Sequence, residues 1–475
     1  TRSRLMRLTA MLPALLGTLL VGGCNSLGVG DLNNPGVENL QNSPTRVGVL
    51  TLATGLQVGS RYQMSAQNGY TALLGIMGRE VYNFDPADPR FISEMVVGPL
   101  DGGSPAFGGN LFQLFYANIR TSNILMRAMA GLSDDPQAGM TAAEKEATTG
   151  YVQTLQAYDF LRIINTRDEY GAPVDVDIDP TGEPAPIKTK AEVFTHITNL
   201  LDSAVAHLAA GGSAFPFAMS DGYEDFNQPS TFIKFNRALR ARVAAYQSDY
   251  ATVKRLLEDF PDSTFLNATG PLNAGVYHTY SSASGDVTND LFDPTGRAIV
   301  VNTSFRTDAQ LQAGGAPDKR FTSKTVAIPS KTSQLIVSDL ANNVYTSPSS
   351  PVPVIRNEEL ILLRAEERIF NNDFAGAKAD LDVVRTTAGN LPPYAGPLDQ
   401  PSLLAELLYN RRYSLFLEGG HRWLDLRRFN LLNTLPQENT QSGLGKRFSR
   451  FPFPTNECLS RNPAPAQGCS PENGF

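Results

Sequence analysis

Apolar residues recur at helical spacing along much of the chain. Within residues 110–130 they stand three, four or seven positions apart, as on one face of a helix: Phe112, Phe115, Ile119, Met126 and Met129. Such a stripe more often packs in a core than binds a ligand. Similar patterns predict further helices at 43–66, 141–166, 189–210, 230–247 and 249–259, the first of them capped by Ser43 with Pro44 in its first turn.

Two of these helix starts carry a capping box. Thr141 stands three residues before Glu144, and Thr189 stands three residues before Glu192. In this arrangement the hydroxyl and the carboxylate accept hydrogen bonds from backbone amides that have no partner inside the helix. The spacing therefore predicts helix starts at about 141 and 189.

The helical pattern disappears between about residues 262 and 356. This stretch is rich in Gly, Ser, Thr, Asn and Pro, and it contains short β-like runs at 298–302 and 335–337. A second irregular region extends from Tyr82 to Asn110. Irregular stretches of this length inside a compact protein usually have a function or form a small subdomain.

Helical spacing resumes at 357–370 and 374–387, with a tight turn between the two segments. Together they resemble the antiparallel helix pair of a tetratricopeptide unit, although the full 34-residue signature is absent. The pattern predicts a mainly α-helical protein: a tetratricopeptide-like helical repeat scaffold with long irregular loops and a few short β-strands.

The first residues have the layout of a signal peptide. Three arginines precede an apolar run of about 14 residues, which is too short to cross a bilayer as a settled helix. The sequence Val21-Gly22-Gly23-Cys24 follows and resembles the lipobox of bacterial lipoproteins. We therefore expect residues 1–23 to be removed, Cys24 to carry lipid, and the Gly- and Asn-rich residues 24–42 to form a flexible tether. The alternative is an ordinary cleavage site beside a free cysteine.

The other two of the three cysteines, Cys458 and Cys469, lie in a tail rich in Pro, Asn and Ser. In an exported protein we expect them to form a disulfide that pins residues 457–475. Their spacing is not that of a C-x-x-C redox motif.

Charge argues against some partners. The formal net charge is −7, and removal of residues 1–23 leaves 37 basic and 47 acidic side chains, or −10. No basic tract interrupts this balance, so neither nucleic acid nor purely electrostatic binding to anionic lipid is expected.

Motifs for chemistry are missing from the sequence. The four histidines form no metal motif, because His196 and His207 would stand about 16 Å apart on one helix. There is no H-E-x-x-H, no G-x-S-x-G and no phosphate loop. We predict no metal, no cofactor and no catalytic residues, although a pair of carboxylates suited to glycoside hydrolysis cannot be recognised from sequence.

The strongest local similarity lies at residues 410–428, which read NRRYSLFLEGGHRWLDLRR. This segment resembles the late signature of the SusD/RagB family, roughly E-R-R-x-E-L, two residues, E-G-x-R-x-x-D-L-x-R. Further similar segments follow the family's order, at 151–173, 192–208, 237–246, 318–321, 359–389 and 451–454. Asn410 and Ser414 replace two expected glutamates, and Gly420 adds a residue before Arg422.

The resemblance implies a SusD-like helical domain over residues 43–475 and a non-enzymatic, lipid-anchored binding protein of the outer membrane. Family members cap a SusC-like TonB-dependent transporter at the cell exterior and deliver oligosaccharides or, in some branches, peptides. The charged residues of the signature then have a structural role: Arg411, Arg412, Glu418, Arg422 and Asp425. On one helix, Glu418 and Arg422 would pair at a spacing of four residues.

The family's ligand surface is formed by loops of the N-terminal third and the middle stretch. Sugars bind to exposed aromatic rings and to amide or carboxylate groups. The candidate ligand-binding residues in these loops are Tyr82, Asn83, Phe84, Phe91, Phe107, Tyr277, Tyr280, Phe292 and Phe305. Packing within the loop explains each of these residues, taken singly, as well as contact with a ligand does.

Two other functions stay open at this point. A lipid-anchored glycoside hydrolase would have the same export signals, and a structural assembly protein would use the helical scaffold to contact other proteins.

Overall fold

The structure is a computed structural model that describes residues 43–104, 109–179 and 182–475. The predicted signal peptide, Cys24, the tether and Phe107 lie outside the described residues.

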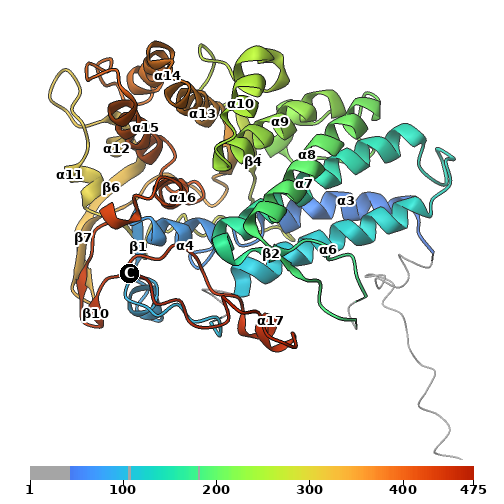
Figure 1. Ribbon diagram of the computed structural model, residues 1–475, viewed down its shortest axis with the longest axis horizontal. Coiled ribbons are helices and arrows are strands. Elements are labelled where there is room, and N and C mark those ends of the chain that lie inside the picture. The colour runs from blue at the N-terminus through green and yellow to red at the C-terminus, as the bar shows by residue number, and fades with distance from the viewer. Residues whose placement is uncertain (1–42, 105–108, 180–181) are drawn as a thin grey trace, which may run out of the picture.

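Helices dominate the fold (Figure 1). The N-terminal half contains α3 (Arg46–Arg61), α4 (Tyr70–Met77), α5 (Arg90–Ser93), α6 (Asn110–Ala130), α7 (Ala142–Arg167), α8 (Lys190–Ala210), α9 (Pro229–Tyr246) and α10 (Tyr250–Lys254). The C-terminal half contains α11 (Ser304–Thr307), α12 (Lys319–Lys324), α13 (Asn357–Phe370), α14 (Phe374–Thr387), α15 (Gln400–Ser414), α16 (His421–Arg428) and α17 (Thr455–Leu459).

The strands are short. A four-stranded antiparallel sheet has the order β1-β5-β7-β6, formed by β1 (Val81–Asn83), β5 (Ile299–Val301), β7 (Ile336–Asn342) and β6 (Thr325–Ser333). Three further antiparallel pairs join β2 (Ala172–Pro173) to β3 (Ile187–Lys188), β4 (Gly275–His278) to β8 (Val352–Arg356), and β9 (Asn439–Thr440) to β10 (Gly443–Leu444). The mainly α fold class with a few short strands is therefore confirmed.

Two groups of helices flank the irregular segments. Figure 1 shows α3 and α6 to α9, coloured blue to green, on one side and α13 to α15, coloured orange to brown, on the other. Within the first group α7 packs on α6 and α8, and within the second α13 packs on α14 and α15. The helix pair α13–α14 has the boundaries that the sequence predicted.

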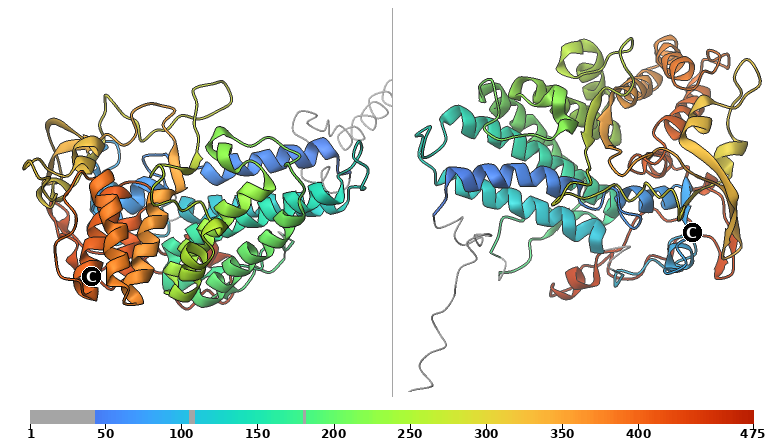
Figure 2. Two further views of the ribbon diagram at one scale, coloured as in Figure 1. Left: turned by 90° about the horizontal axis from the view of Figure 1, so that it is seen from above. Right: turned by 180° about the vertical axis from the view of Figure 1, so that it is seen from behind.

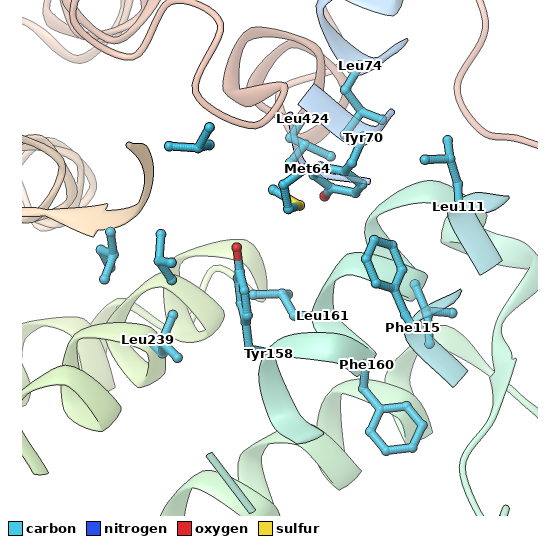
Figure 3. Close-up of a cluster of buried hydrophobic side chains, with 14 of the residues drawn as sticks. Met64, Tyr70, Leu74, Leu111, Phe115, Tyr158, Phe160, Leu161, Leu239 and Leu424 are labelled. Atoms are coloured by element: carbon cyan, nitrogen blue, oxygen red, sulfur yellow. The ribbon is translucent and has the colours of Figure 1, made fainter. Parts of the chain in front are cut away.

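A shared core joins the two groups. Figure 3 shows Tyr70 of α4, Phe115 of α6, Leu161 of α7, Leu239 of α9 and Leu424 of α16 in one buried cluster. A second, smaller cluster fills the space between α13, α14 and α15. The helices therefore form one body with a separately packed helical hairpin at one end.

Helix starts agree with the predictions where a capping box is present. Both capping boxes form, at Thr141 with Glu144 and at Thr189 with Glu192. The first predicted helix is wrong at its start: Thr45, not Ser43, is the cap, because its hydroxyl accepts a hydrogen bond from the Gly48 amide at 3.1 Å. That helix also ends at Arg61 rather than near residue 66.

The C-terminal tail is fixed to the body. Cys458 and Cys469 form a disulfide, and the Phe453 amide donates to the Gly468 carbonyl at 2.7 Å. Leu100 and Glu472 form an isolated antiparallel bridge. Within the residues described, no helix is both long enough and apolar enough to cross a membrane.

Candidate functional site

The antiparallel pairing of β1 with β5 brings two of the predicted loops together. Asn83 pairs with Ile299, and the Phe84 amide donates to the Ala298 carbonyl at 2.8 Å. The chain that follows β1 therefore meets the chain that precedes β5. Between them lies a cavity of about 460 Å³, here called the β1 hollow, lined by Ala66, Gln67, Asn68, Asn83, Asp85, Asp88, Phe91, Asp290, Phe292 and Asp293.

Asn83 holds this hollow in shape. Its side chain is 1% exposed, its Nδ2 donates to the Gln67 carbonyl at 3.2 Å, and its Oδ1 accepts from the Asp85 amide at 2.9 Å. Both polar atoms of the amide are thus used within the protein. Asn83 therefore positions the residues around it.

The carboxylates of the β1 hollow differ in their partners. Asp293 accepts from the Gly296 and Ala298 amides, which fixes the loop. The Arg90 guanidinium donates to Asp88 and lowers the pKa of that carboxyl. Asp85 is half-buried and accepts from the Ala87 amide at 2.9 Å. Asp290 is exposed, and among the described residues its carboxylate accepts only from the Thr288 hydroxyl, at 3.1 Å, while its backbone carbonyl accepts from Nε2 of Gln67 at 3.2 Å. Asp290 is therefore the carboxylate best able to accept hydrogen bonds from a ligand.

Aromatic rings complete this region. Phe292 is half-buried in the lining of the hollow and Phe91 is buried beneath it. Phe84, also half-buried, stacks on Tyr82 with a centroid separation of 6.3 Å. Carboxylate, amide and apolar ring surface thus occur together, which is the combination that a sugar requires.

A second cavity of about 350 Å³, here called the Tyr277 hollow, lies beside the C-terminal end of α3. Its lining includes Thr54, Val58 and Arg61 of α3 and Tyr277 of β4. Tyr277 is half-buried, and its hydroxyl donates to the Asn273 carbonyl.

Three other predicted ligand residues are buried. Phe305 is 0% exposed and stacks on Tyr413 at 4.4 Å and on Phe416 at 4.3 Å. Tyr82 is 3% exposed, and its hydroxyl lies between Glu438 and Asn302. Tyr280 is 4% exposed beneath the Arg61 guanidinium. In this structure these rings fill the core and present no face to a ligand.

The charged signature residues form ion pairs within the protein, buried for Arg411 with Asp425 and partly exposed for Arg412 with Asp308. Arg411 donates to Asp425 at 2.6 Å, and Arg412 donates to Asp308 at 2.7 Å. The predicted pair of Glu418 with Arg422 is wrong: α15 ends at Ser414 and α16 begins at His421, so the two residues do not share a helix. Glu418 instead accepts from Arg356 at 2.8 Å.

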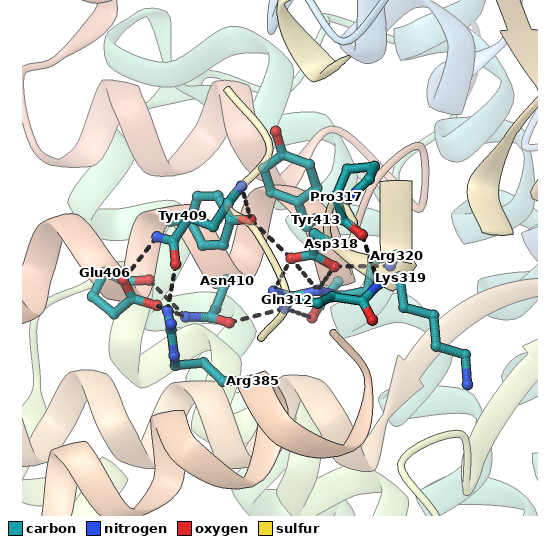
Figure 4. A network of polar contacts seen from close by, with 12 residues as sticks. Gln312, Pro317, Asp318, Lys319, Arg320, Arg385, Glu406, Tyr409, Asn410 and Tyr413 are labelled. Atoms are coloured by element: carbon teal, nitrogen blue, oxygen red, sulfur yellow. Dashed lines mark hydrogen bonds and ion pairs between the residues drawn. The ribbon is translucent and has the colours of Figure 1, made fainter. Parts of the chain in front are cut away.

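A polar network explains two departures from the family pattern (Figure 4). Arg320 is 3% exposed, pairs with Asp318 at 2.6 Å, and also donates to Asn410 at 2.9 Å and Ser414 at 3.0 Å. At the positions where glutamates were expected, neutral oxygens accept from the same guanidinium. One carboxylate, from Asp318, is therefore the anion that balances this buried arginine.

Histidines and acids give no metal centre. Among the residues described, no group of three or more His, Cys, Asp or Glu side chains could hold a metal ion. Burial lowers the pKa of His421 to about 4 and that of His278 well below its ordinary value. Both rings are therefore neutral at physiological pH.

Larger hollows exist elsewhere. One of about 810 Å³ extends along α6, but Arg127 and Arg461 in its lining are paired with Asp177 and Glu457. Among the described residues, none of the predicted ligand residues lines it, whereas Asn83, Phe91 and Phe292 line the β1 hollow. Gln67 and Asp290 lie in loops without periodic signals, so no sequence pattern indicates them.

Comparison with known proteins identifies the fold. Residues 309–462 match the model of the SusD family. A SusD superfamily protein from Bacteroides vulgatus has a similar structure, with a TM-score of 0.62, 13% identity, and coverage of 90% of this chain and 98% of that one. No curated protein matches the chain in sequence.

Two further structures are similar at low sequence identity. A laminarin-binding SusD-like protein has a TM-score of 0.64 and 17% identity, covering 87% of this chain and 97% of that one. A SusD-like carbohydrate-binding protein from Bacteroides fragilis has a TM-score of 0.65 and 15% identity, covering 84% and 89%. These comparisons confirm the resemblance seen in the sequence: the chain carries a SusD-family segment at residues 309–462 on a SusD-like fold.

Proposed function

We propose that this chain is a lipid-anchored, non-enzymatic binding protein that captures oligosaccharides at the outer membrane. The observation that carries the proposal is the β1 hollow, where the exposed Asp290, the amide of Gln67 and the ring of Phe292 meet on a SusD-like fold. Two SusD-like proteins of similar structure bind laminarin and carbohydrate, by their own descriptions. Peptide is the less favoured ligand.

The proposal extends to delivery. Lipid on Cys24 would hold the protein at the membrane, residues 24–42 would act as a tether, and the body would hand its ligand to a SusC-like TonB-dependent transporter. Support for this part comes from the lipobox-like sequence around Cys24 and from the family segment at 309–462.

Binding to polysaccharides tests the ligand class. The mature protein is run by affinity electrophoresis through gels containing laminarin, starch, xylan, chitosan or pectin, and retardation in at least one gel is expected. Asp290→Asn should weaken that binding about tenfold, because a hydrogen bond to a charged group is lost. Asp262→Asn, which changes an exposed aspartate outside the lining of the hollow, should bind like the wild type.

Two results would contradict the proposal. Release of shorter sugars from any of these polysaccharides by the purified protein would favour the hydrolase. Failure to bind any glycan or peptide would favour a structural role. Co-purification of the tagged protein with an outer-membrane barrel tests the transporter separately.

A further inference from the structure

The β1 hollow and the Tyr277 hollow are bounded by the same two chain segments. Arg61 lines the Tyr277 hollow and Ala66 lines the β1 hollow, five residues later. Asp286 lines the Tyr277 hollow, and Asp290, four residues later, lines the β1 hollow. Four residues reach at most about 14 Å, so the linings of the two hollows come within about that distance of each other.

Helix α3 places an aromatic ring beyond the Tyr277 hollow. Thr54 and Val58 line that hollow, and Tyr62, the residue that caps the C-terminal end of α3, follows Val58 by four residues. The chain continues from Tyr62 to Ala66 and Gln67 in the wall of the β1 hollow. Tyr62 therefore stands on the path between the two hollows.

Tyr62 is exposed without an evident packing role. Half of its surface, 50%, is accessible to solvent. Within the described part of the chain, its ring stacks on no other ring and no guanidinium, and its hydroxyl has no hydrogen-bond partner. Its backbone is nevertheless held, because the Tyr62 amide donates to the Gly59 carbonyl at 3.2 Å. An exposed ring on a fixed backbone can stack on a ligand without ordering a loop.

Arg61 fixes the opposite side of this path. It donates to the Thr279 carbonyl and to Asp286, and so ties the end of α3 to the chain that separates the two hollows. In the rear view of Figure 2, this chain passes beside the C-terminal end of α3. Val287, which follows Asp286, is 50% exposed and adds apolar surface there. Arg61 and Asp286 thus balance each other's charge.

We propose that the two hollows form one extended site for an oligosaccharide of several units, with Tyr62 as the ring on which a central unit stacks. This inference rests on the proposed function. Carboxylate and amide groups of the β1 hollow would accept and donate to hydroxyls at one end of the ligand, and Tyr277 would contact the other end. A monosaccharide or disaccharide would occupy one hollow and leave the other empty.

The test measures how ligand length and the Tyr62 ring each affect the binding affinity. Glucose oligomers of two and six units prepared from laminarin are titrated into the mature protein by calorimetry. If another polysaccharide of the panel binds instead, oligomers of that polysaccharide are used. The wild type should bind the six-unit ligand at least tenfold more tightly than the two-unit ligand. Tyr62→Ala should lose about five- to tenfold in affinity for the longer ligand, as expected for one aromatic contact, and little for the shorter one.

Control variants separate the possible outcomes. Phe260→Ala removes another exposed ring, which is 60% accessible to solvent. This variant should bind like the wild type. Circular dichroism checks that every variant is folded. Equal affinities for both ligand lengths, or unchanged binding of the six-unit ligand by Tyr62→Ala, would overturn the extended site while leaving the proposed function in place. Absence of binding to any glycan would instead overturn the proposed function and the extended site together.

Discussion

Glu80 lies in the core next to strand β1, and its side chain is unusual for its surroundings. The residue is 1% exposed and forms no ion pair within the described chain. Burial raises the pKa of its carboxyl from 4.5 to about 8, although Arg412 and Lys324 partly offset the effect. Glu80 therefore retains its proton at neutral pH in the folded state, whereas it releases the proton on unfolding.

This difference predicts a pH dependence of stability. Between about pH 4.5 and 8 the folded state binds one proton more than the unfolded state, so the free energy of unfolding falls as pH rises. Glu80→Gln keeps the neutral shape and should be more stable than the wild type at pH 8, by on the order of a few kcal/mol, with no advantage at pH 4. Urea unfolding at both values measures this. Glu224→Gln, at an exposed position, should follow the wild type, and equal slopes for Glu80→Gln and wild type would contradict the prediction.

At the scale of single residues, the sequence indicates where the β1 hollow lies better than which residues line it. Asn83, Phe91 and Phe292 line the β1 hollow, while Tyr82 and Phe305 are buried. All three residues of β1 are buried, so the alternation of a half-exposed strand does not separate Tyr82 from Asn83. The helix predicted at 43–66 would place Tyr62 in its interior, whereas α3 ends at Arg61, so the sequence does not single Tyr62 out.

At the scale of elements, local signals decided what could be predicted. The helices at 142–167 and 190–210 begin within one residue of their predicted starts because each capping box lies within four residues of sequence. The hairpin of β6 and β7 was predicted only as residues 335–337, since its pairing depends on partners across the sheet. The break between α15 and α16 was also missed.

The conformation and close packing of Gly420 maintain the break between α15 and α16. Gly420 is the N-terminal cap of α16, its φ is +78°, and a Cβ added there would lie 2.3 Å from Cβ of Leu74 in α4. Gly420→Ala should therefore destabilise the protein by about 2–4 kcal/mol, from overpacking and an unfavourable backbone conformation. Thermal unfolding followed by circular dichroism measures this loss.

Gly55 provides the matched control for this substitution. A Cβ added at Gly55 of α3 meets nothing within 4 Å. Gly55→Ala should leave stability unchanged or raise it slightly, because alanine favours the helix. A similar melting temperature for both variants would show that the contact between Gly420 and Leu74 does not fix the junction of α15 and α16.

At the scale of the whole molecule, the proposed function requires the protein to be held at a membrane. None of the described helices is suited to cross a bilayer, and the net charge without residues 1–23 is −10. Like charges repel an anionic membrane surface, so electrostatic attraction would not retain the protein. In the proposed function, lipid on Cys24 carries the attachment.

Cys24→Ser should consequently move the protein from the membrane pellet to the soluble fraction, and lipid should be absent from its N-terminal peptide in mass spectrometry. The double change Cys458→Ser with Cys469→Ser is the control, since it removes the other two cysteines and their disulfide. That variant should stay in the pellet even if it is less stable, because a disulfide constrains folding and does not contact lipid. Retention of Cys24→Ser in the pellet would mean that the body itself binds the membrane or a membrane protein. Washing with high salt would then distinguish a charged contact, which salt weakens, from an apolar one.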